Sequence, residues 1–318
     1  MNILVFEPIY QERVWGGRGF AESLGRQLPE GQVIGESWEM VDRPEAQSLV
    51  STGEFEGKSI REIIETHCAQ VMGPSYDAKK PFPILVKWLD CQDRLSLQVH
   101  PPAEIAGELG GEPKTENWYI VDCKPGAGLL VGLKKGATRE AFEESLKDDS
   151  TEKLVQRIPV KIGDSMFVYS GRIHAIDAGN LIIEIQQNSD TTYRVYDWGR
   201  VGLDGKPRKL HVEESLKSID FADFEPPILH PEGDRQTLAR SDVFDLARVN
   251  IRKEQSLDFK AGEQPRILSV VNGTVIEKNS GTKLAKGTNA LLPFDGCFSF
   301  VSDGDDATVL ITENFTGA

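Results

Sequence analysis

Histidine is the side chain in this sequence best suited to bind a metal or to move a proton near neutral pH. The chain has five histidines: His67, His100, His174, His211 and His230. His67 belongs to a helical pattern, and His211 and His230 lie in turn-rich connecting sequence, so we interpret these three as surface or core residues. His100 and His174 each follow a strand-like run, and this context makes them the candidates for chemistry.

His100 shares its strand-like run with a second polar side chain, Gln98. Successive strand residues point to opposite faces, so Gln98 and His100 project from one face. Leu95, Leu97 and Val99 are expected on the other face. Two polar groups directed into the interior of a β fold are costly unless something binds them. The face of Gln98 and His100 is therefore a candidate binding surface.

A carboxylate and a second imidazole come later in the chain. Glu116 follows Lys114 by two residues and precedes a strand-like run, and His174 follows another such run and a glycine turn. Two imidazoles, a carboxylate and an amide oxygen form a mixed nitrogen and oxygen set that suits zinc or a neighbouring divalent metal with one position left open. The pattern predicts a catalytic metal site. The alternative is two unrelated histidines on a β scaffold.

The elements that must position these residues are mostly short strands separated by Gly, Pro and Asp turns. The strand-like runs cover 84–89, 95–100, 118–121, 129–133, 165–169 and 181–186. Such regularly spaced strands predict a mainly β sandwich or barrel. Helical periodicity is confined to residues 59–72, 138–146, 151–158 and a short stretch at 212–219. The helices are therefore expected to decorate a β core.

Residues 220–234 are rich in proline and acidic side chains and mark the best candidate domain boundary. We expect a catalytic, metal-binding domain with helical insertions over residues 1–230. Residues 231–318 contain further strand-like runs and no histidine. This second part is predicted to be a smaller β domain without metal ligands.

Composition excludes several classes of partner. The 318 residues include 36 Lys and Arg against 50 Asp and Glu, a net charge of −14, which disfavours nucleic acid and anionic membrane surfaces. No apolar run approaches the length of a spanning helix, and the N-terminus lacks the pattern of a signal peptide. The four cysteines form no CxxC pair and are expected to be reduced thiols. We therefore expect a cytoplasmic protein.

Longer motifs add a family resemblance. Residues 98–101, Glu116 and residues 163–180 resemble the two metal-binding motifs of cupins. The strings VWGG at 14–17, GESWE at 35–39, GRIHA at 171–175 and EIQQNSDTTYRVYDWGR at 184–200 are similar to type I mannose-6-phosphate isomerases of the short bacterial form. The match runs from about Val14 to Phe221. It implies a double-stranded β-helix, the cupin jelly roll, followed by a smaller β jelly roll.

The resemblance also implies roles for individual residues. The positions matching the family's zinc ligands, for one zinc ion per chain, are Gln98, His100, Glu116 and His174. Arg194 matches the active-site arginine, Asp190 an aspartate proposed for acid and base work, and Lys114 a lysine of the site. This chain has Thr115 where longer members have proline, and its segment 195–200 also differs from theirs. The zinc ligands are expected to survive these changes, whereas substrate contacts beyond Arg194 are left open.

The reaction implied by the resemblance interconverts mannose 6-phosphate and fructose 6-phosphate through ring opening and an enediol. Such a proton transfer needs a base, for which Asp190 and Glu184 are the candidates, and positive charge near the developing oxyanion. The glycine-rich stretch 16–19 lacks the ending of a P-loop. The phosphate is instead expected to meet scattered basic and hydroxyl groups, with Lys87, Ser96, Lys114 and Arg194 as candidates.

Several alternatives stay open at this point. Lys87 is equally consistent with a surface residue on an edge strand, and Trp15 and Trp38 with core aromatics instead of walls of the sugar site. The chain is also compatible with another metal-dependent cupin, such as a dioxygenase, or with a non-catalytic sugar-binding cupin. The expected partner is a small sugar phosphate, with no nucleic acid and no membrane. A monomer or weak homodimer is expected.

Overall fold

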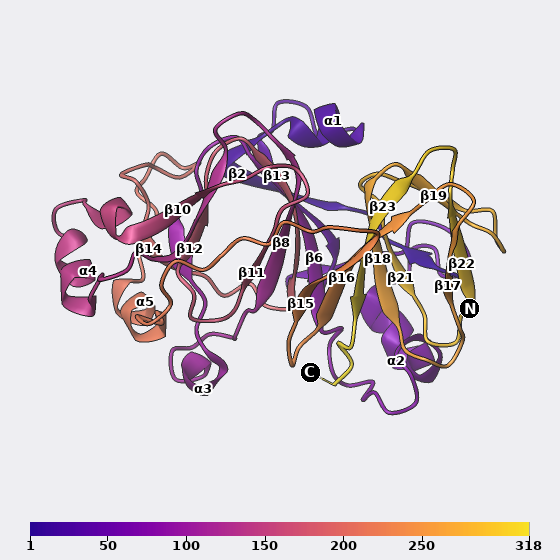
Figure 1. The fold of residues 1–318 in the computed structure, drawn as a ribbon. Coiled ribbons are helices and arrows are strands. Elements are labelled where there is room, and N and C mark those ends of the chain that lie inside the picture. Colours follow the sequence, from indigo (N-terminus) through magenta and orange to yellow (C-terminus); the bar gives the residue numbers. More distant parts are fainter. Residues whose placement is uncertain (318) are drawn as a thin grey trace. The chain divides into compact units, whose positions relative to one another are not determined.

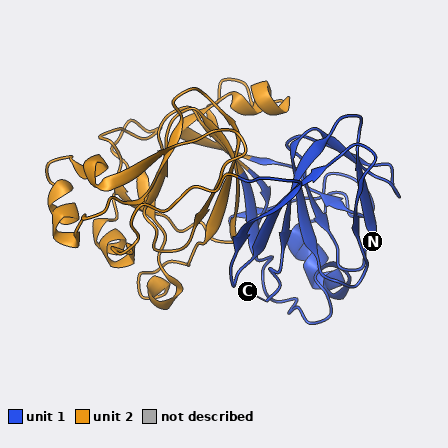
Figure 2. Ribbon diagram, viewed as in Figure 1, with its two compact units in different colours: residues 1–9, 38–87, 231–318 blue, residues 10–37, 88–230 orange. Residues whose placement is uncertain are grey.

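The computed structural model describes residues 1–317, and its elements are predominantly strands (Figure 1). The predicted mainly β fold is confirmed. The chain divides into two compact units, which we call unit 1 (residues 1–9, 38–87 and 231–318) and unit 2 (residues 10–37 and 88–230) (Figure 2). The limits of the units fall within β2 (Ile9–Gly17), β3 (Ile34–Met40) and β6 (Ile84–Cys91).

The units differ from the predicted domains in one respect. The predicted boundary after residue 230 is also a limit of the units, but residues 1–9 and 38–87 group with residues 231–318. The reason is pairing across the sequence. β1 (Leu4–Val5) pairs with β21 (Asn289–Leu292), and the carbonyl of Val71 at the end of α2 (Ile60–Val71) accepts a hydrogen bond from the Phe294 amide at 3.0 Å. Such long-range pairings leave no local signal in the sequence.

Unit 1 is built on two antiparallel sheets around one apolar core. The sheet orders are β1-β21-β18-β23-β16-β15 and β17-β22-β19-β20. The core between them includes Leu268, Val270, Phe300 and Val309, all 0 % exposed. The remaining elements of unit 1 are β4 (Asp42–Arg43), β5 (Ala46–Gln47), β15 (Arg235–Arg240), β16 (Asp245–Ile251), β17 (Ser256–Phe259), β18 (Arg266–Asn272), β19 (Thr274–Glu277), β20 (Lys283–Ala285), β22 (Phe298–Ser302) and β23 (Ala307–Glu313).

Unit 2 contains a five-stranded sheet of order β10-β9-β12-β7-β14 and most of a six-stranded sheet of order β11-β8-β13-β6-β3-β2. Its strands are β7 (Leu97–Val99), β8 (Glu116–Cys123), β9 (Gly128–Leu133), β10 (Val155–Pro159), β11 (Ser165–Val168), β12 (His174–Ile176), β13 (Asn180–Gln187) and β14 (Tyr193–Tyr196). Its helices are α1 (Gly19–Leu24), α3 (Ala103–Ala106), α4 (Arg139–Ser145), the 3-10 helix η1 (Thr151–Leu154) and α5 (Val212–Ser218).

One face of each sheet in unit 2 lines a shared interior. On the six-stranded sheet, the register pairs Ile182 with Ile120, and both side chains belong to a buried cluster that also holds Leu129, Val131 and Ile176 of the five-stranded sheet. The register shifts between Leu181 and Ile182, but from Ile120 back to Glu116 and from Ile182 on to Gln186 it is regular. Because paired residues project from the same face, the alternating residues of these two stretches follow the two isoleucines inward. We call this space the interior of unit 2.

The opposite face of the five-stranded sheet carries α4 and α5 (Figure 1). Leu97, Val99 and Leu130 form a second cluster with Phe142 of α4 and the partly buried Leu216 of α5. The predicted helices over 138–146 and 212–219 correspond to α4 and α5. The prediction of a helix over 151–158 is wrong beyond residue 154, because Val155 and the residues after it pair with β9 as an edge strand.

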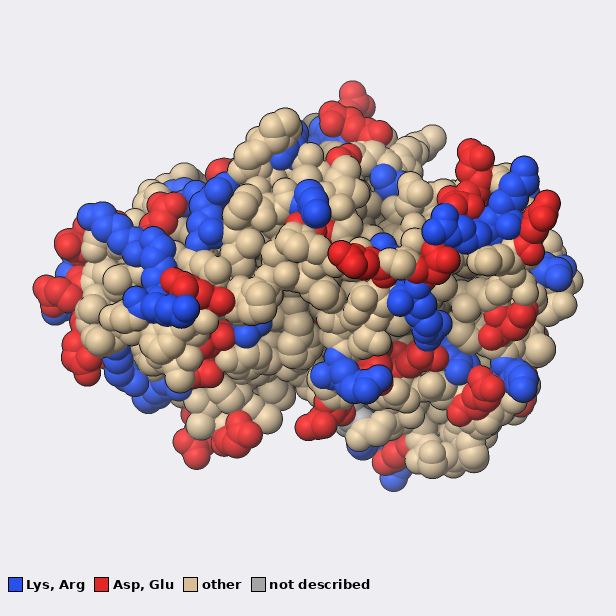
Figure 3. Space-filling model, in the orientation of Figure 1, with Lys and Arg blue, Asp and Glu red and all other residues tan. Residues whose placement is uncertain are grey.

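The surface and the thiols fit the composition. On the face drawn in Figure 3, acidic and basic side chains are interspersed and form no large patch of one sign. All four cysteines are free thiols, as expected. Among residues 1–317, no helix is long and apolar enough to cross a membrane. Localisation in the cytoplasm and the oligomeric state stay predictions.

Candidate metal centre and active site

Three strands bring one ligand candidate each to the same end of the interior of unit 2. His100 directly follows β7, Glu116 is the first residue of β8, and His174 is the first residue of β12. Their candidate ligand atoms all lie within 4.8 Å of one another, and all three residues are 0 % exposed. The two histidines and the carboxylate predicted from the sequence therefore meet in space.

Backbone carbonyls fix the tautomer of both imidazoles. Nδ1 of His100 lies 2.7 Å from the Thr191 carbonyl oxygen, and Nδ1 of His174 lies 2.8 Å from that of Arg172. A carbonyl oxygen only accepts, so each Nδ1 carries the proton and donates it. Each Nε2 is left with its lone pair, and these atoms lie 3.5 Å and 3.6 Å from the carboxylate oxygens of Glu116.

The unsatisfied atoms of this cluster fit a divalent cation. Nε2 of His100 and Nε2 of His174 are buried without a hydrogen-bond partner, and the buried carboxylate of Glu116 faces them, with the Lys114 ammonium 3.1 Å from its Oε2. Buried lone pairs left in this state are costly, whereas a metal ion would satisfy all of them at once. Imidazoles that donate Nδ1–H to a carbonyl are also the usual form of metal-binding histidine.

The electrostatics keep these groups in their ligand forms. Burial lowers the pKa of His100, helped by the charge of Lys114, and burial together with the neighbouring His100 lowers the pKa of His174 to about 3. Burial alone would raise the pKa of Glu116, but the charge of Lys114 and the two imidazoles hold it well below its ordinary value. At neutral pH the cluster is two neutral imidazoles and one carboxylate.

Gln98 lies in a lateral row of side chains on the interior face of the five-stranded sheet. The register pairs His174 with Gln98, and Gln98 with Arg194. Directly paired residues project from the same face, so the amide of Gln98 stands between the His174 and Arg194 side chains. This placement agrees with the alternation read from the sequence, although β7 spans only residues 97–99 and Leu95 packs in the interior instead of with Leu97. A ligand role for Gln98 stays a prediction.

Lys114 and Glu184 form a second, charged layer beside the metal cluster. Nζ of Lys114 lies 3.1 Å from Glu116 Oε2 and 3.7 Å from Glu184 Oε1. Burial alone would lower the pKa of Lys114, but the charges of Glu116, Glu184 and Asp190 raise it, so the ammonium stays protonated. Lys114 and Glu184 are each 4 % exposed. Asp190 is exposed, and the structure brings its charge within reach of Lys114.

Arg194 brings a guanidinium to the same face as Gln98. Its Nε donates to Ser96 Oγ at 3.3 Å, and its Nη1 donates to the Lys209 carbonyl at 2.9 Å. Ser96 itself is buried. These contacts hold the side chain at two points. The structure therefore joins Ser96 and Arg194, which are far apart in the sequence.

Lys87 is a buried residue, which rules out the alternative of a surface lysine on an edge strand. It is 3 % exposed, and its Nζ lies 4.8 Å from the centre of the Trp38 ring. Lys87 alternates along β6 with Leu89 and Cys91, two members of the interior cluster. Its side chain is therefore on the inward face of that strand.

Trp15 packs in the buried cluster of the interior of unit 2, and its contact with the substrate stays a prediction. It is 4 % exposed within the interior cluster, and its carbonyl accepts hydrogen bonds from the amides of Gln92 and Asp93. Gln92 lies near the first end of β13, where Asn180 pairs with Cys123. The other end of β13, where Gln186 pairs with Glu116, is six residues further along the strand. At about 3.3 Å per residue, the two ends are about 20 Å apart. The hydrogen bonds from Gln92 and Asp93 hold the backbone carbonyl of Trp15 near the Asn180 end of β13, while its side chain packs in one cluster with Trp118.

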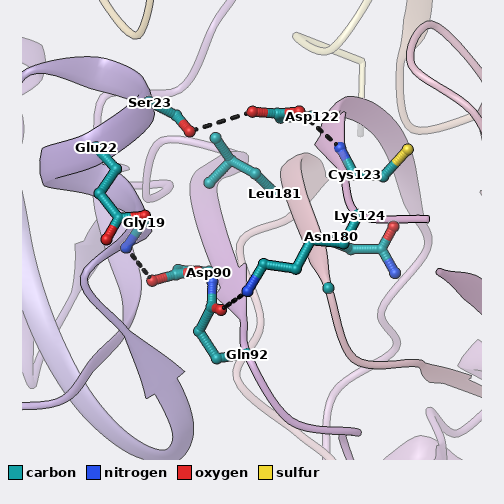
Figure 4. A pocket seen from close by; sticks show the side chains of 11 residues that line it. Gly19, Glu22, Ser23, Asp90, Gln92, Asp122, Cys123, Lys124, Asn180 and Leu181 are labelled. Carbon is teal, nitrogen blue, oxygen red and sulfur yellow. Dashed lines mark hydrogen bonds between the residues drawn. The ribbon is translucent and has the colours of Figure 1, made fainter. Parts of the chain in front are cut away.

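That distant end holds a polar pocket of its own (Figure 4). Its side chains come from α1, β6, β8 and β13 and are largely paired with one another. Asp90 accepts hydrogen bonds from the Gly19 amide and from Gln92, and Gln92 accepts one from Lys124. Ser23 donates to Asp122. The pocket contains no histidine, and its bonded network stabilises this end of the unit.

The sequence reasoning missed Trp118. This residue is two positions after Glu116, so strand alternation alone could have placed it on the same inward face. The register pairs it with Glu184, and its indole Nε1 donates to Glu184 Oε2 at 2.8 Å. Its ring also meets His174 edge-on, with centroids 5.3 Å apart.

Comparisons with known proteins agree with this site. Residues 3–131 match the family model for phosphomannose isomerase type I, catalytic domain. The chain is 35 % identical over 303 residues to mannose-6-phosphate isomerase ManA of Bacillus subtilis, covering 92 % of this chain and 93 % of that protein. It is 35 % identical over 247 residues to mannose-6-phosphate isomerase of Streptococcus mutans, covering 75 % and 77 %.

Solved structures show the same fold. The mannose 6-phosphate isomerase from Bacillus subtilis superposes with a TM-score of 0.81 at 29 % identity, covering 98 % of this chain and 100 % of that one. A mannose 6-phosphate isomerase bound with zinc and yttrium gives a TM-score of 0.75 at 16 % identity, covering 99 % and 100 %. This second likeness concerns the fold alone.

The comparisons place the chain in the class of isomerases that are intramolecular oxidoreductases, which confirms the predicted enzyme class. Within that class, the chain belongs to the type I phosphomannose isomerase family.

Proposed function

We propose that this protein interconverts mannose 6-phosphate and fructose 6-phosphate with one zinc ion per chain. The observation that carries the proposal is the convergence of two buried, unpartnered imidazole Nε2 atoms on Glu116, directly beside the charged pair of Lys114 and Glu184. The names of the Bacillus subtilis and Streptococcus mutans relatives support the substrate.

The residues that would hold zinc are His100, Glu116 and His174, with the amide oxygen of Gln98 as a fourth ligand. This mixed donor set suits zinc with a position left open for substrate. A structural relative was solved bound with zinc. When bound, zinc supplies a Lewis acid that polarises the carbonyl and hydroxyl oxygens of the open-chain sugar.

Glu184 is the better placed of the two candidate bases. Its carboxylate is buried at the inward face of β13 next to Lys114, whereas Asp190 is exposed. In the proposed reaction Glu184 takes the proton from C2 and returns it to C1, while a second proton moves from O2 to O1. No atom is gained or lost. Asp190 helps to keep Lys114 protonated, and the ammonium stabilises negative charge on the enediol oxygens.

Arg194 is proposed to bind the anionic end of the substrate. A guanidinium forms two parallel hydrogen bonds to a phosphate, and Ser96 steadies the Nε side of this one. Lys87 is the further cation proposed for the phosphate. Arg194 and Lys114 bring positive charge to the interior of unit 2 in a protein whose net charge is −14.

Unit 2 carries the proposed metal ligands, and residues 231–318 carry none of them. We therefore propose that catalysis belongs to the part of the chain before residue 231. The C-terminal β part is proposed to have a structural role.

A coupled assay tests the proposal directly. Purified protein is supplied with mannose 6-phosphate, with glucose 6-phosphate as a second substrate, and fructose 6-phosphate is measured while bound metal is counted. We expect turnover of mannose 6-phosphate, close to one zinc per chain and loss of activity with a chelator. Activity in metal-free protein would refute the role of zinc. Tight sugar binding without turnover would indicate a non-catalytic sugar-binding protein instead.

Two variants separate metal binding from substrate binding. His174→Ala should lose zinc and activity together, because it removes a ligand. Arg194→Ala should keep zinc and lose turnover, because its guanidinium is not among the proposed ligands. Equal loss of zinc from both variants would show that Arg194 is misassigned.

A further inference from the structure

Trp118 lies at the point where the metal cluster and the proposed base meet. It is 0 % exposed and lies on the inward face of β8, two residues after Glu116. Its indole N–H donates across the strands to Glu184 Oε2 at 2.8 Å, and its ring packs edge-on against His174 at an interplanar angle of 75°. One side chain therefore contacts both a proposed zinc ligand and the proposed base.

The hydrogen bond of Trp118 is not a general requirement of this core. Trp88 is also 0 % exposed, and its indole Nε1 has no hydrogen-bond partner. The fold thus tolerates one buried indole N–H without a partner, although such a group usually has one. The partner of Trp118 is a buried carboxylate, which is the strongest kind of acceptor available to an indole.

The bond determines how Glu184 presents its two oxygens. Oε2 is held by the indole, and Oε1 lies on the side of Lys114, at 3.7 Å from Nζ. A carboxylate free to rotate about its terminal torsion would exchange these oxygens and vary its distance to the reacting carbon. A base contributes fully only when it is held in the productive geometry.

We propose that Trp118 is a positioning residue that locks the Glu184 carboxylate against the metal centre through its indole N–H. This inference rests on the proposed function and adds to it a residue that never touches the reacting carbon. Its role acts through Glu184, while the ring contact with His174 fixes the spacing between base and metal cluster.

The test compares Trp118→Phe with Trp88→Phe. Both changes remove an indole from a fully buried site and keep an aromatic ring, but only the first removes a bonded N–H. We expect Trp118→Phe to lower kcat by about 10- to 100-fold, as for other residues that orient catalytic groups, with KM and zinc content within about 2-fold of wild type. Trp88→Phe should leave kcat within about 2-fold.

A double-mutant cycle shows whether Trp118 acts through Glu184. Glu184→Gln removes the base, so adding Trp118→Phe to it should cause little further loss of kcat. The inference is overturned if Trp118→Phe lowers kcat in the Glu184→Gln background by the same factor as in the wild type. It is also overturned if, in the wild-type background, Trp118→Phe changes kcat no more than Trp88→Phe does. If Trp118→Phe loses its zinc, its role is structural and the inference is also overturned.

A second readout leaves the tryptophan in place. In a ¹H–¹⁵N spectrum, Glu184→Gln should shift the indole signal of Trp118 and leave that of Trp88 unchanged. If the phenylalanine variant does not fold, Trp118 is replaced by benzothienylalanine, which keeps the shape of the side chain and has sulfur in place of N–H. This replacement should reproduce the loss of kcat. A wild-type protein that does not turn over mannose 6-phosphate refutes the proposed function. An active wild type with an unshifted indole signal refutes this inference alone.

Discussion

Replacing Lys114 by methionine should destabilise the metal-free protein far more than the metal-loaded protein. Lys114 lies 3.1 Å from Glu116 and 3.7 Å from Glu184, and both the ammonium and the two carboxylates are buried. At an effective dielectric constant of about 20, the closer contact alone corresponds to about 5 kcal/mol of attraction. Methionine keeps the length of the alkyl chain and leaves the two carboxylates without their cation.

The magnitude follows from what remains after the change. Removing one partner of a buried ion pair typically costs about 3–5 kcal/mol, because the other charge is left buried and unpaired. We expect that loss in the free energy of unfolding when the protein is treated with a chelator. When zinc is bound by Glu116, the metal supplies positive charge at the same carboxylate, so most of the loss should disappear.

The assay is urea unfolding of the wild type and Lys114→Met, each with a chelator and with zinc. Lys147→Met is the matched control, because its ammonium lies only 2.7 Å from Glu144 but both side chains are more than 70 % exposed. An exposed pair of this kind contributes little to stability, because water screens the two charges. The reasoning fails if Lys114→Met loses less than the control variant, or if zinc does not reduce its loss.

Two further predictions concern Arg194 and Asp177. Ser96→Ala should raise KM for the sugar phosphate by about 2- to 10-fold with zinc content unchanged, as expected for one lost hydrogen bond to the Arg194 guanidinium, and steady-state kinetics would measure it. Burial alone would raise the pKa of Asp177, but its hydrogen bonds from Arg94 and Arg157 hold that pKa below its ordinary value. A depressed pKa in the folded state stabilises the fold above the unfolded pKa of about 3.9 and loses this effect as pH falls through the folded value. Unfolding measurements should therefore show Asp177→Asn less stable than wild type by about 1–3 kcal/mol at pH 7, with the gap shrinking below pH 4; a gap that grows on acidification would contradict this.

The local pattern of the chain was a sound guide wherever one strand or helix decides the outcome. Alternation placed Gln98 on the inward face, and helical spacing found α2, whose N-terminus carries the Ser59 and Glu62 capping box. The pattern failed at residues 155–158, where pairing with β9 outweighed helical periodicity. An edge strand depends on a free neighbour, and a local window contains no information about that neighbour.

Contacts between distant segments were beyond the reach of the same reasoning. Trp15 packs in one buried cluster with Trp118 and Ile182, and nothing local to the sequence around Trp15 indicates that contact. The grouping of residues 1–9 and 38–87 with residues 231–318 likewise rests on pairings such as β1 with β21.

The sequence by itself determined the chemistry available to this protein: two histidines, a carboxylate and an amide on β strands, an arginine and a lysine nearby, and the family motifs that contain them. Side-chain type and strand period are local properties, so they can be read along the chain. Only the tertiary structure decided that His100, Glu116 and His174 share one buried point. It also decided that backbone carbonyls fix the tautomers of the two histidines and that Trp118 holds Glu184. Those facts depend on which strands lie side by side and in what register, and that is settled by packing of the whole chain.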